Sequence, residues 1–186
     1  MAGRKRAFDR DEVLDRITMA FWRDGFAATS VADLTALTGV NPPSLYAAFG
    51  DKRALFDEAV RHYTAAYGGF IVAALREEPT SRLAIRRLLR EAAAEYTRPG
   101  RPPGCLVLHA PELAEQRRAT AAMVEEKIRH DVRGGALPGT ADPHALALLV
   151  SAVMRGMSDL ARDGATEAEL ADVAEAALSA WPAPVP

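Results

Sequence analysis

The stretch that decides the fold is residues 29–56, which read TSVADLTALTGVNPPSLYAAFGDKRALF. Two short segments with helical spacing of apolar residues, about 31–38 and 42–49, flank the turn at Gly39 and Val40. Glycine is the residue that most often ends a helix. Asn41 can cap the second segment, and prolines are tolerated in its first turn because the N–H groups there have no intrahelical partner. The stretch therefore predicts a helix, a tight turn and a second helix.

The second segment has the two faces that a reading helix needs. A helix that enters the major groove of DNA, about 12 Å wide, must be held by an apolar face and must expose the other. Leu45 and Phe49 supply the held face. The residues on or near the free face are Pro42, Pro43, Ser44, Ala47 and Ala48.

Helical periodicity continues on both sides of this stretch. Asp9 can cap a first helix that Gly25 ends, and Asp51 can cap a long helix over 52–77 that Gly68 and Gly69 could bend. No alternating run predicts a strand. Further helices are expected over 81–96, 142–163 and 166–181, with two more between residues 105 and 132. The sequence thus predicts an all-α fold of about nine helices, with domains over 1–51 and 52–186.

The composition is that of a globular protein. The 186 residues are 49% hydrophobic and 26% charged, with a net charge of −2. The lone cysteine, Cys105, excludes an internal disulfide and a multi-cysteine zinc site, and it fits a reducing cytoplasm. We see no signal peptide and no apolar run of about 18 residues, so we expect a cytoplasmic protein without a membrane partner. Three consecutive cations, Arg4, Lys5 and Arg6, form a basic N-terminal arm that can contact DNA.

Residues 9–60 resemble the DNA-binding segment of the TetR/AcrR family of transcriptional regulators. The matching elements are Gly25-Phe26, Thr29, Gly39-Val40, Leu45-Tyr46, Phe49, Lys52 and Leu55-Phe56. The resemblance implies an N-terminal three-helix DNA reader, a connecting helix and a variable C-terminal domain for ligand binding and dimerisation. It implies a homodimer that binds palindromic operator DNA and represses transcription until a small molecule releases it.

The resemblance also assigns DNA contacts by position. Phosphate contacts fall on Thr29 or Ser30, Ser44, Tyr46 and Lys52, and base-facing positions on Val31, Pro42, Pro43, Ala47 and Ala48. These last five are apolar. At Ala47 and Ala48 the sequence departs from the commoner family pattern, which often has longer polar or aromatic side chains there. Apolar side chains of this kind have no groups for hydrogen bonds to bases. They can contact thymine methyl groups but cannot make bidentate hydrogen bonds to bases. We therefore expect specificity to come from apolar fit, DNA shape, the basic arm or Asn41.

The C-terminal part is expected to hold a small hydrophobic effector with one polar handle. The expected pocket residues are Tyr63, Tyr67, Phe70, Leu88, Ala92, Tyr96, Leu106, His109 and Met123. The helices over 142–163 and 166–181 are strongly apolar on one face, so we expect them to pair with their symmetry mates in a homodimer. The residues that motivate this are Leu146, Leu149, Val153, Met157, Leu170, Val173, Ala177 and Trp181.

Other functions are kept as alternatives. The chain has no nucleophile elbow, phosphate loop or dinucleotide fingerprint, so we expect neither an enzyme nor a cofactor. The four histidines lack paired ligand spacing, so no metal is expected. A helical interaction module without DNA affinity and a thiol sensor acting through Cys105 remain open, because a thiol at a helix start can have a lowered pKa.

Overall fold

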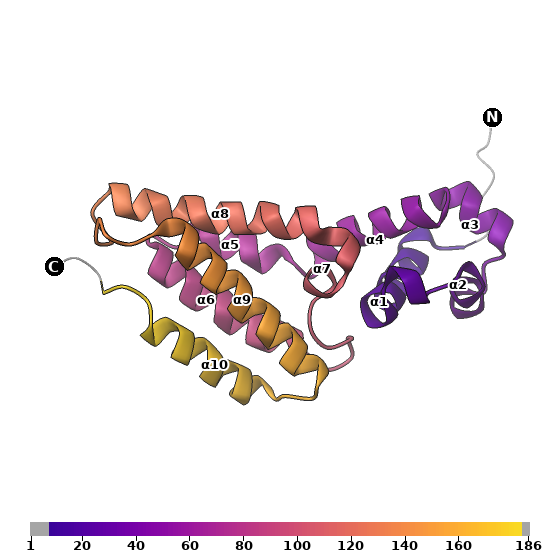
Figure 1. Ribbon diagram of the computed structural model, residues 1–186. Coiled ribbons are helices and arrows are strands. Elements are labelled where there is room, and N and C mark those ends of the chain that lie inside the picture. Colours follow the sequence, from indigo (N-terminus) through magenta and orange to yellow (C-terminus); the bar gives the residue numbers. More distant parts are fainter. Residues whose placement is uncertain (1–7, 184–186) are drawn as a thin grey trace. The chain divides into compact units, whose positions relative to one another are not determined.

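The computed structural model describes residues 8–183 and is shown in Figure 1. These residues form ten α-helices and one short 3-10 helix, with no strand among them, so the predicted all-α class is confirmed. The chain divides into two compact units between Gly68 and Gly69. The first unit therefore includes residues 52–66, which the sequence analysis placed with the C-terminal domain.

The first unit holds four helices around an aromatic core. They are α1 (Arg10–Ala28), α2 (Val31–Thr38), α3 (Pro42–Phe49) and α4 (Lys52–Ala66). The rings of Phe21 and Phe56 meet edge to face with centroids 5.1 Å apart, and Phe26 lies 5.0 Å from Phe56. Ile17, Leu34 and Leu45 complete a core from which water is excluded. This core fixes α2 and α3 on α1 and α4.

Local signals in the sequence place the ends of these helices. Ser30 caps α2 in a capping box with Asp33, and Asn41 caps α3 by accepting a hydrogen bond from the Ser44 N–H at 3.0 Å. Gly39 ends α2 at φ +71°, a left-handed conformation that glycine adopts without the steric penalty of a Cβ. The expected helix-turn-helix is present, with both helices at the expected positions.

The expected continuous helix over 52–77 is interrupted. α4 ends at Ala66, and α5 (Gly69–Glu77) begins after Tyr67 and Gly68. The N–H groups of Tyr67 and Gly68 both donate to the carbonyl of Tyr63, at 2.8 and 3.1 Å, which closes the last turn of α4. Two consecutive glycines lower helix propensity enough for the helix to end here.

The second unit is a helical bundle with its own core. After α5 it contains α6 (Ser81–Tyr96), α7 (Leu106–His109), the 3-10 helix η1 (Pro111–Leu113), α8 (Ala114–Arg133), α9 (Pro143–Arg162) and α10 (Glu167–Ser179). α6, α9 and α10 pack side by side (Figure 1). A buried carboxylate, Asp131, accepts hydrogen bonds from the N–H and hydroxyl of Ser81 at 2.5 and 2.7 Å and so joins the end of α8 to the start of α6.

Candidate nucleic-acid interface

Helix α3 has the two faces expected of a reading helix. Leu45 and Phe49 are buried against the rest of the first unit. Pro42, Pro43 and Ala47 are exposed, and Ala48 is half-buried. Tyr46 is 47% exposed although it is aromatic. One side of α3 is therefore held rigidly while the other is open and almost entirely apolar.

Arg10, at the start of α1, holds the C-terminal end of α3. Its guanidinium lies 4.5 Å from the centroid of the Phe49 ring and donates a long hydrogen bond, 3.4 Å, to the carbonyl of Ala48. The same group makes a two-pronged ion pair with Glu58 of α4, at 2.6 and 2.8 Å. One side chain thus connects three helices at the reading helix.

Lys52 lies in the first turn of α4, with its ammonium 4.4 Å from the centroid of the Phe26 ring. The carboxylate of Asp33 is close enough for the positive charge of Lys52 to act on it. The pKa of Asp33 lies below its usual value, first because Ser30 donates hydrogen bonds to it and to a smaller degree because of Lys52. Lys52 is half-buried as a residue, and its ammonium lies against an aromatic ring, a position from which it can reach a phosphate.

Three of the other expected phosphate contacts, Thr29, Ser30 and Ser44, take part in local hydrogen bonds. Thr29 is only 2% exposed, and its hydroxyl donates to the carbonyl of Gly25 at 2.7 Å. The hydroxyl of Ser30 is exposed but donates to the Asp33 carboxylate at 2.6 Å. Ser44 is half-buried, and its N–H is bonded to Asn41. Thr29 thus stabilises the turn before α2, while Ser30 and Tyr46 lie at the surface.

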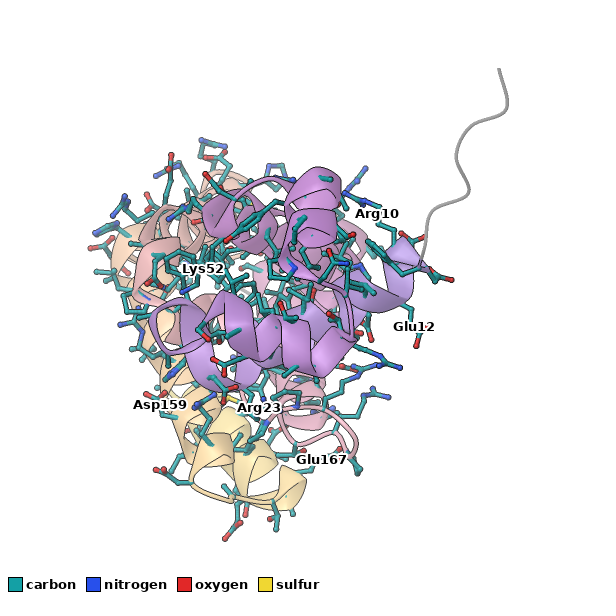
Figure 2. The ribbon with its side chains drawn as sticks, turned by 90° about the vertical axis from the view of Figure 1, so that its right-hand side faces the viewer. Arg10, Glu12, Arg23, Lys52, Asp159 and Glu167 are labelled. Carbon is teal, nitrogen blue, oxygen red and sulfur yellow. The ribbon has the colours of Figure 1, made fainter. Side chains whose placement is uncertain are left out.

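The basic residues of this unit are spread over its surface. Figure 2 shows the labelled side chains of Arg10 and Lys52 on well-separated parts of the unit.

The remaining expected DNA contacts differ in exposure. Val31 is half-buried at the start of α2, and Asn41 is exposed. The expected arm, Arg4, Lys5 and Arg6, lies outside the described residues.

Three residues that shape this surface were not expected to act there. Arg10 and Phe26 position α3 and Lys52, and Asp33 fixes Ser30. Asp33 follows a serine at capping-box spacing, a signal that is visible in the sequence. The contacts of Arg10 join residues 38 and 48 positions apart, so no local pattern indicates them.

The residues expected to form an effector pocket fall into three groups. Tyr63 and Tyr67 belong to the first unit, where the Tyr63 ring meets that of Trp22 edge to face at 4.8 Å. Within the second unit, the fully buried ones are Leu88, Ala92, Tyr96 and Leu106. Phe70 is half-buried, His109 is exposed and Met123 is 42% exposed. Four of the nine expected pocket residues are therefore buried within the second unit.

Cys105 is buried in the second unit. Its N–H donates to the hydroxyl of Ser158 at 2.9 Å, and the preceding Gly104 packs closely against Ser158. Burial raises the pKa of the neighbouring Tyr96 phenol well above its usual value, and the thiol of Cys105 raises it further. Reactive cysteines are generally exposed in electropositive surroundings, so this burial does not favour the thiol-sensor alternative.

Only part of the apolar set predicted to form the dimer is available on these helices. Leu149 is exposed, and the half-buried members are Leu146, Val153, Val173 and Ala177. Met157, Leu170 and Trp181 are buried within the protomer, because they point into the unit's own core. The large apolar side chains left exposed on α9 are Leu148, Leu149 and Leu160, with exposures of 55%, 37% and 42%. The exposed Ala152 and Gly156 lie between them in sequence.

Two other kinds of site, a metal centre and a membrane-spanning helix, are absent from the described part of the chain. No group of three or more histidine, cysteine, aspartate or glutamate side chains is placed there to hold a metal ion. None of the helices over residues 8–183 has the length and apolar character needed to cross a membrane.

Comparison with known proteins agrees with this geometry. Residues 13–59 match the model of the tetR family of bacterial regulatory proteins. The chain is 31% identical over 193 residues to the HTH-type transcriptional repressor ComR of Escherichia coli K12, covering 97% of this chain and 92% of that protein. It is also 31% identical to the repressor BdcR of the same organism, covering 87% and 83%. A cysteine-substituted CifR, a TetR family transcriptional regulator solved with 26-bp operator DNA, superposes with a TM-score of 0.91 at 38% identity, covering 97% of this chain and 100% of that one.

Proposed function

This chain belongs to the tetR family of bacterial regulatory proteins, and we propose that it represses transcription by binding operator DNA through α2, α3 and the start of α4. The observation that carries the proposal is the combination of an exposed apolar face on α3 with Lys52 at the first position of the helix that follows it. The relatives ComR and BdcR are named as repressors, and the structurally similar CifR is bound to operator DNA.

Helix α9 supports a homodimer as the binding form. Its exposed leucines leave an apolar face on the second unit, and burying such a face against a symmetry mate is favourable. Two reading helices related by two-fold symmetry could then enter successive major grooves, about 34–36 Å apart. Leu148→Glu should give a chain that sediments as a monomer, whereas Leu83→Glu, on α6, should leave the dimer intact. Wild-type protein that sediments as a monomer at micromolar concentration would contradict this part of the proposal.

We also propose that a small, mainly apolar molecule releases the protein from DNA. The buried residues Leu88, Ala92, Tyr96 and Leu106 make the second unit apolar inside, which suits such a molecule. By linkage, the effector must bind free protein more tightly than DNA-bound protein. Ala92→Trp should reduce the response to the effector while leaving the dimer intact.

The test of DNA binding is a salt titration. The probe is a duplex from the intergenic region beside the protein's own gene, and the measurement is fluorescence anisotropy between about 50 and 200 mM salt. Lys52→Ala should weaken binding to all duplexes. It should also make the negative slope of log K against log salt shallower by about 2 for a dimer, since each phosphate contact contributes about −0.9 to that slope.

Arg61→Ala is the matched control for Lys52→Ala. Arg61 is an exposed cation on the same helix, nine residues and so about 14 Å further along α4. Its loss should leave the slope within about 0.5 of the wild-type value. If the wild-type protein bound no duplex at low salt, or if Lys52→Ala left affinity and slope unchanged, the docking of α4 on a phosphate would be wrong.

A further inference from the structure

Few of the exposed side chains on the reading helix can form hydrogen bonds. Of the exposed residues of α3, Pro42, Pro43 and Ala47 have no polar side-chain atom. On α2, the hydroxyl of Thr35 donates to the carbonyl of Val31 at 2.9 Å, and that of Thr38 to the carbonyl of Leu34 at 2.7 Å. These hydroxyls are therefore engaged within their own helix.

The polar groups that remain cannot read a base pair by themselves. Reading adenine with an asparagine needs both the Oδ1 and the Nδ2 atoms in a bidentate pair. The Oδ1 atom of Asn41 already accepts the Ser44 N–H at 3.0 Å and caps α3, so a bidentate pair would cost the helix its cap. Ser44 and Tyr46 each offer a single hydroxyl, and Ser30 is engaged with Asp33.

The exposed face of α3 presents apolar side-chain atoms, those of Pro42, Pro43 and Ala47. In the major groove the only methyl group on any of the four base edges is the C5 methyl of thymine, and side chains such as alanine contact it directly. We propose, on the basis of the DNA-binding function proposed above, that the described residues recognise their operator mainly through thymine methyl groups packed against Pro42, Pro43 and Ala47. Operators would then carry thymines at the positions that face α3.

Recognition of thymine methyl groups can be separated experimentally from hydrogen-bond readout of the bases. Replacing thymine by uracil removes only the C5 methyl and leaves every donor and acceptor of the base pair in place. A basic arm in the minor groove would not sense this change, because the methyl group lies in the major groove. Sensitivity to uracil therefore separates reading by α3 from reading by the arm.

The experiment uses the full chain and two duplexes. A tight-binding sequence is first selected from a random double-stranded library, and it is then resynthesised with every thymine of the protected region replaced by uracil. Burying one methyl group changes affinity about fourfold, so two contacted methyls, one in each half-site, give about 15-fold. We expect the uracil duplex to bind at least 10-fold more weakly, and an unselected duplex to change less than twofold on the same replacement.

Two variants sharpen the test. Ala47→Gln places an amide on the reading face, and we expect a new selected sequence enriched in adenine and a smaller penalty for uracil. Ala65→Gln makes the same change at an exposed position near the other end of α4 and should keep the wild-type sequence and penalty. Circular dichroism confirms that both variants are folded.

The outcomes are separable from those of the proposed function. If the uracil duplex binds within twofold of the thymine duplex, methyl recognition is refuted while DNA binding stands. If Ala47→Gln keeps both the selected sequence and the uracil penalty, Ala47 does not face the bases and the proposal is likewise refuted. If no sequence is enriched and all duplexes bind equally weakly or not at all, the operator-binding function itself fails.

Discussion

The contacts of Arg10 predict that one side chain outside the reading helix controls how firmly that helix is held. Arg10 and Glu58 are only 25% and 20% exposed as side chains, so their ion pair is more shielded from water than an ordinary surface pair. We assign about 1 kcal/mol to this two-pronged pair and about 1 kcal/mol to the contact with the Phe49 ring. The 3.4 Å hydrogen bond to Ala48 is too long to add much.

Arg10→Ala should therefore lower the free energy of unfolding by about 2 kcal/mol. A double-mutant cycle with Glu58→Ala, measured by urea denaturation, should give a coupling energy of about 1 kcal/mol. Arg10→Lys should recover only part of the loss, because an ammonium lacks the planar fork of a guanidinium. Arg16→Ala is the matched control, since its ion pair with Glu12 on the same helix has side-chain exposures of 51% and 60% and should contribute about 0.3 kcal/mol.

Binding to DNA provides a second measurement for Arg10. A looser α3 should bind the selected operator more weakly and discriminate less against unrelated duplexes. The salt slope should stay at the wild-type value, because the guanidinium is engaged with Glu58 and Phe49. A coupling energy below about 0.3 kcal/mol would show that the Arg10–Glu58 ion pair does not hold α3. If Arg10→Ala made the salt slope shallower, as expected for Lys52→Ala, Arg10 would instead be a phosphate contact.

Three further predictions concern the second unit. Gly104→Ala should lower the free energy of unfolding by about 2–3 kcal/mol, because the residue has φ +77° and the new Cβ would lie 2.7 Å from the Ser158 carbonyl oxygen. Gly100 has a similar φ of +81° but open space around it, so Gly100→Ala should cost only about 1 kcal/mol in the same urea titration. The Glu125 carboxylate raises the pKa of His144 from the ordinary 6.5 through a hydrogen bond of 3.0 Å, so the stabilisation should be present below that ordinary pKa and be lost as pH rises through the raised one. Between pH 5.5 and 8.5 the urea midpoint of the wild-type protein should thus decrease more than that of His144→Gln. If both midpoints changed by the same amount, the contact between His144 and Glu125 would contribute no stability. Cys105 should react with a thiol reagent much more slowly in the native protein than in urea, and equal rates would show that the thiol is accessible.

The local parts of this fold can be predicted from the sequence, and the long-range parts cannot. Asn41 and Asp51 each cap a helix where their sequence context indicates, since capping depends on residues only two or three positions away. The side of α9 that faces the core was harder to predict. Almost every turn of that helix carries apolar residues on more than one side, so periodicity did not show that Met157 points inward.

The same division applies to the candidate site. The exposed apolar face of α3 follows from spacing alone, because Leu45 and Phe49 fix which side is buried. The freedom of each hydroxyl does not follow from spacing. Thr29 and Ser30 are neighbours in the sequence. The Thr29 hydroxyl nevertheless donates to the carbonyl of Gly25, whereas the Ser30 hydroxyl donates to the Asp33 carboxylate at the surface. Only the folded chain distinguishes them.

The connection between the two units changes how an effector signal can reach the reading helix. A continuous helix over 52–77 would act as a lever, but α4 ends before Gly68, and its last turn is fastened to α1. The Asp15 carboxylate accepts a hydrogen bond from the Tyr67 hydroxyl at 2.5 Å and lies 3.1 Å from the Nε2 atom of His62. α1 and α4 are therefore tied together up to the residue before the glycines. These contacts favour a first unit that moves as one body, with the geometry of α3 within it preserved.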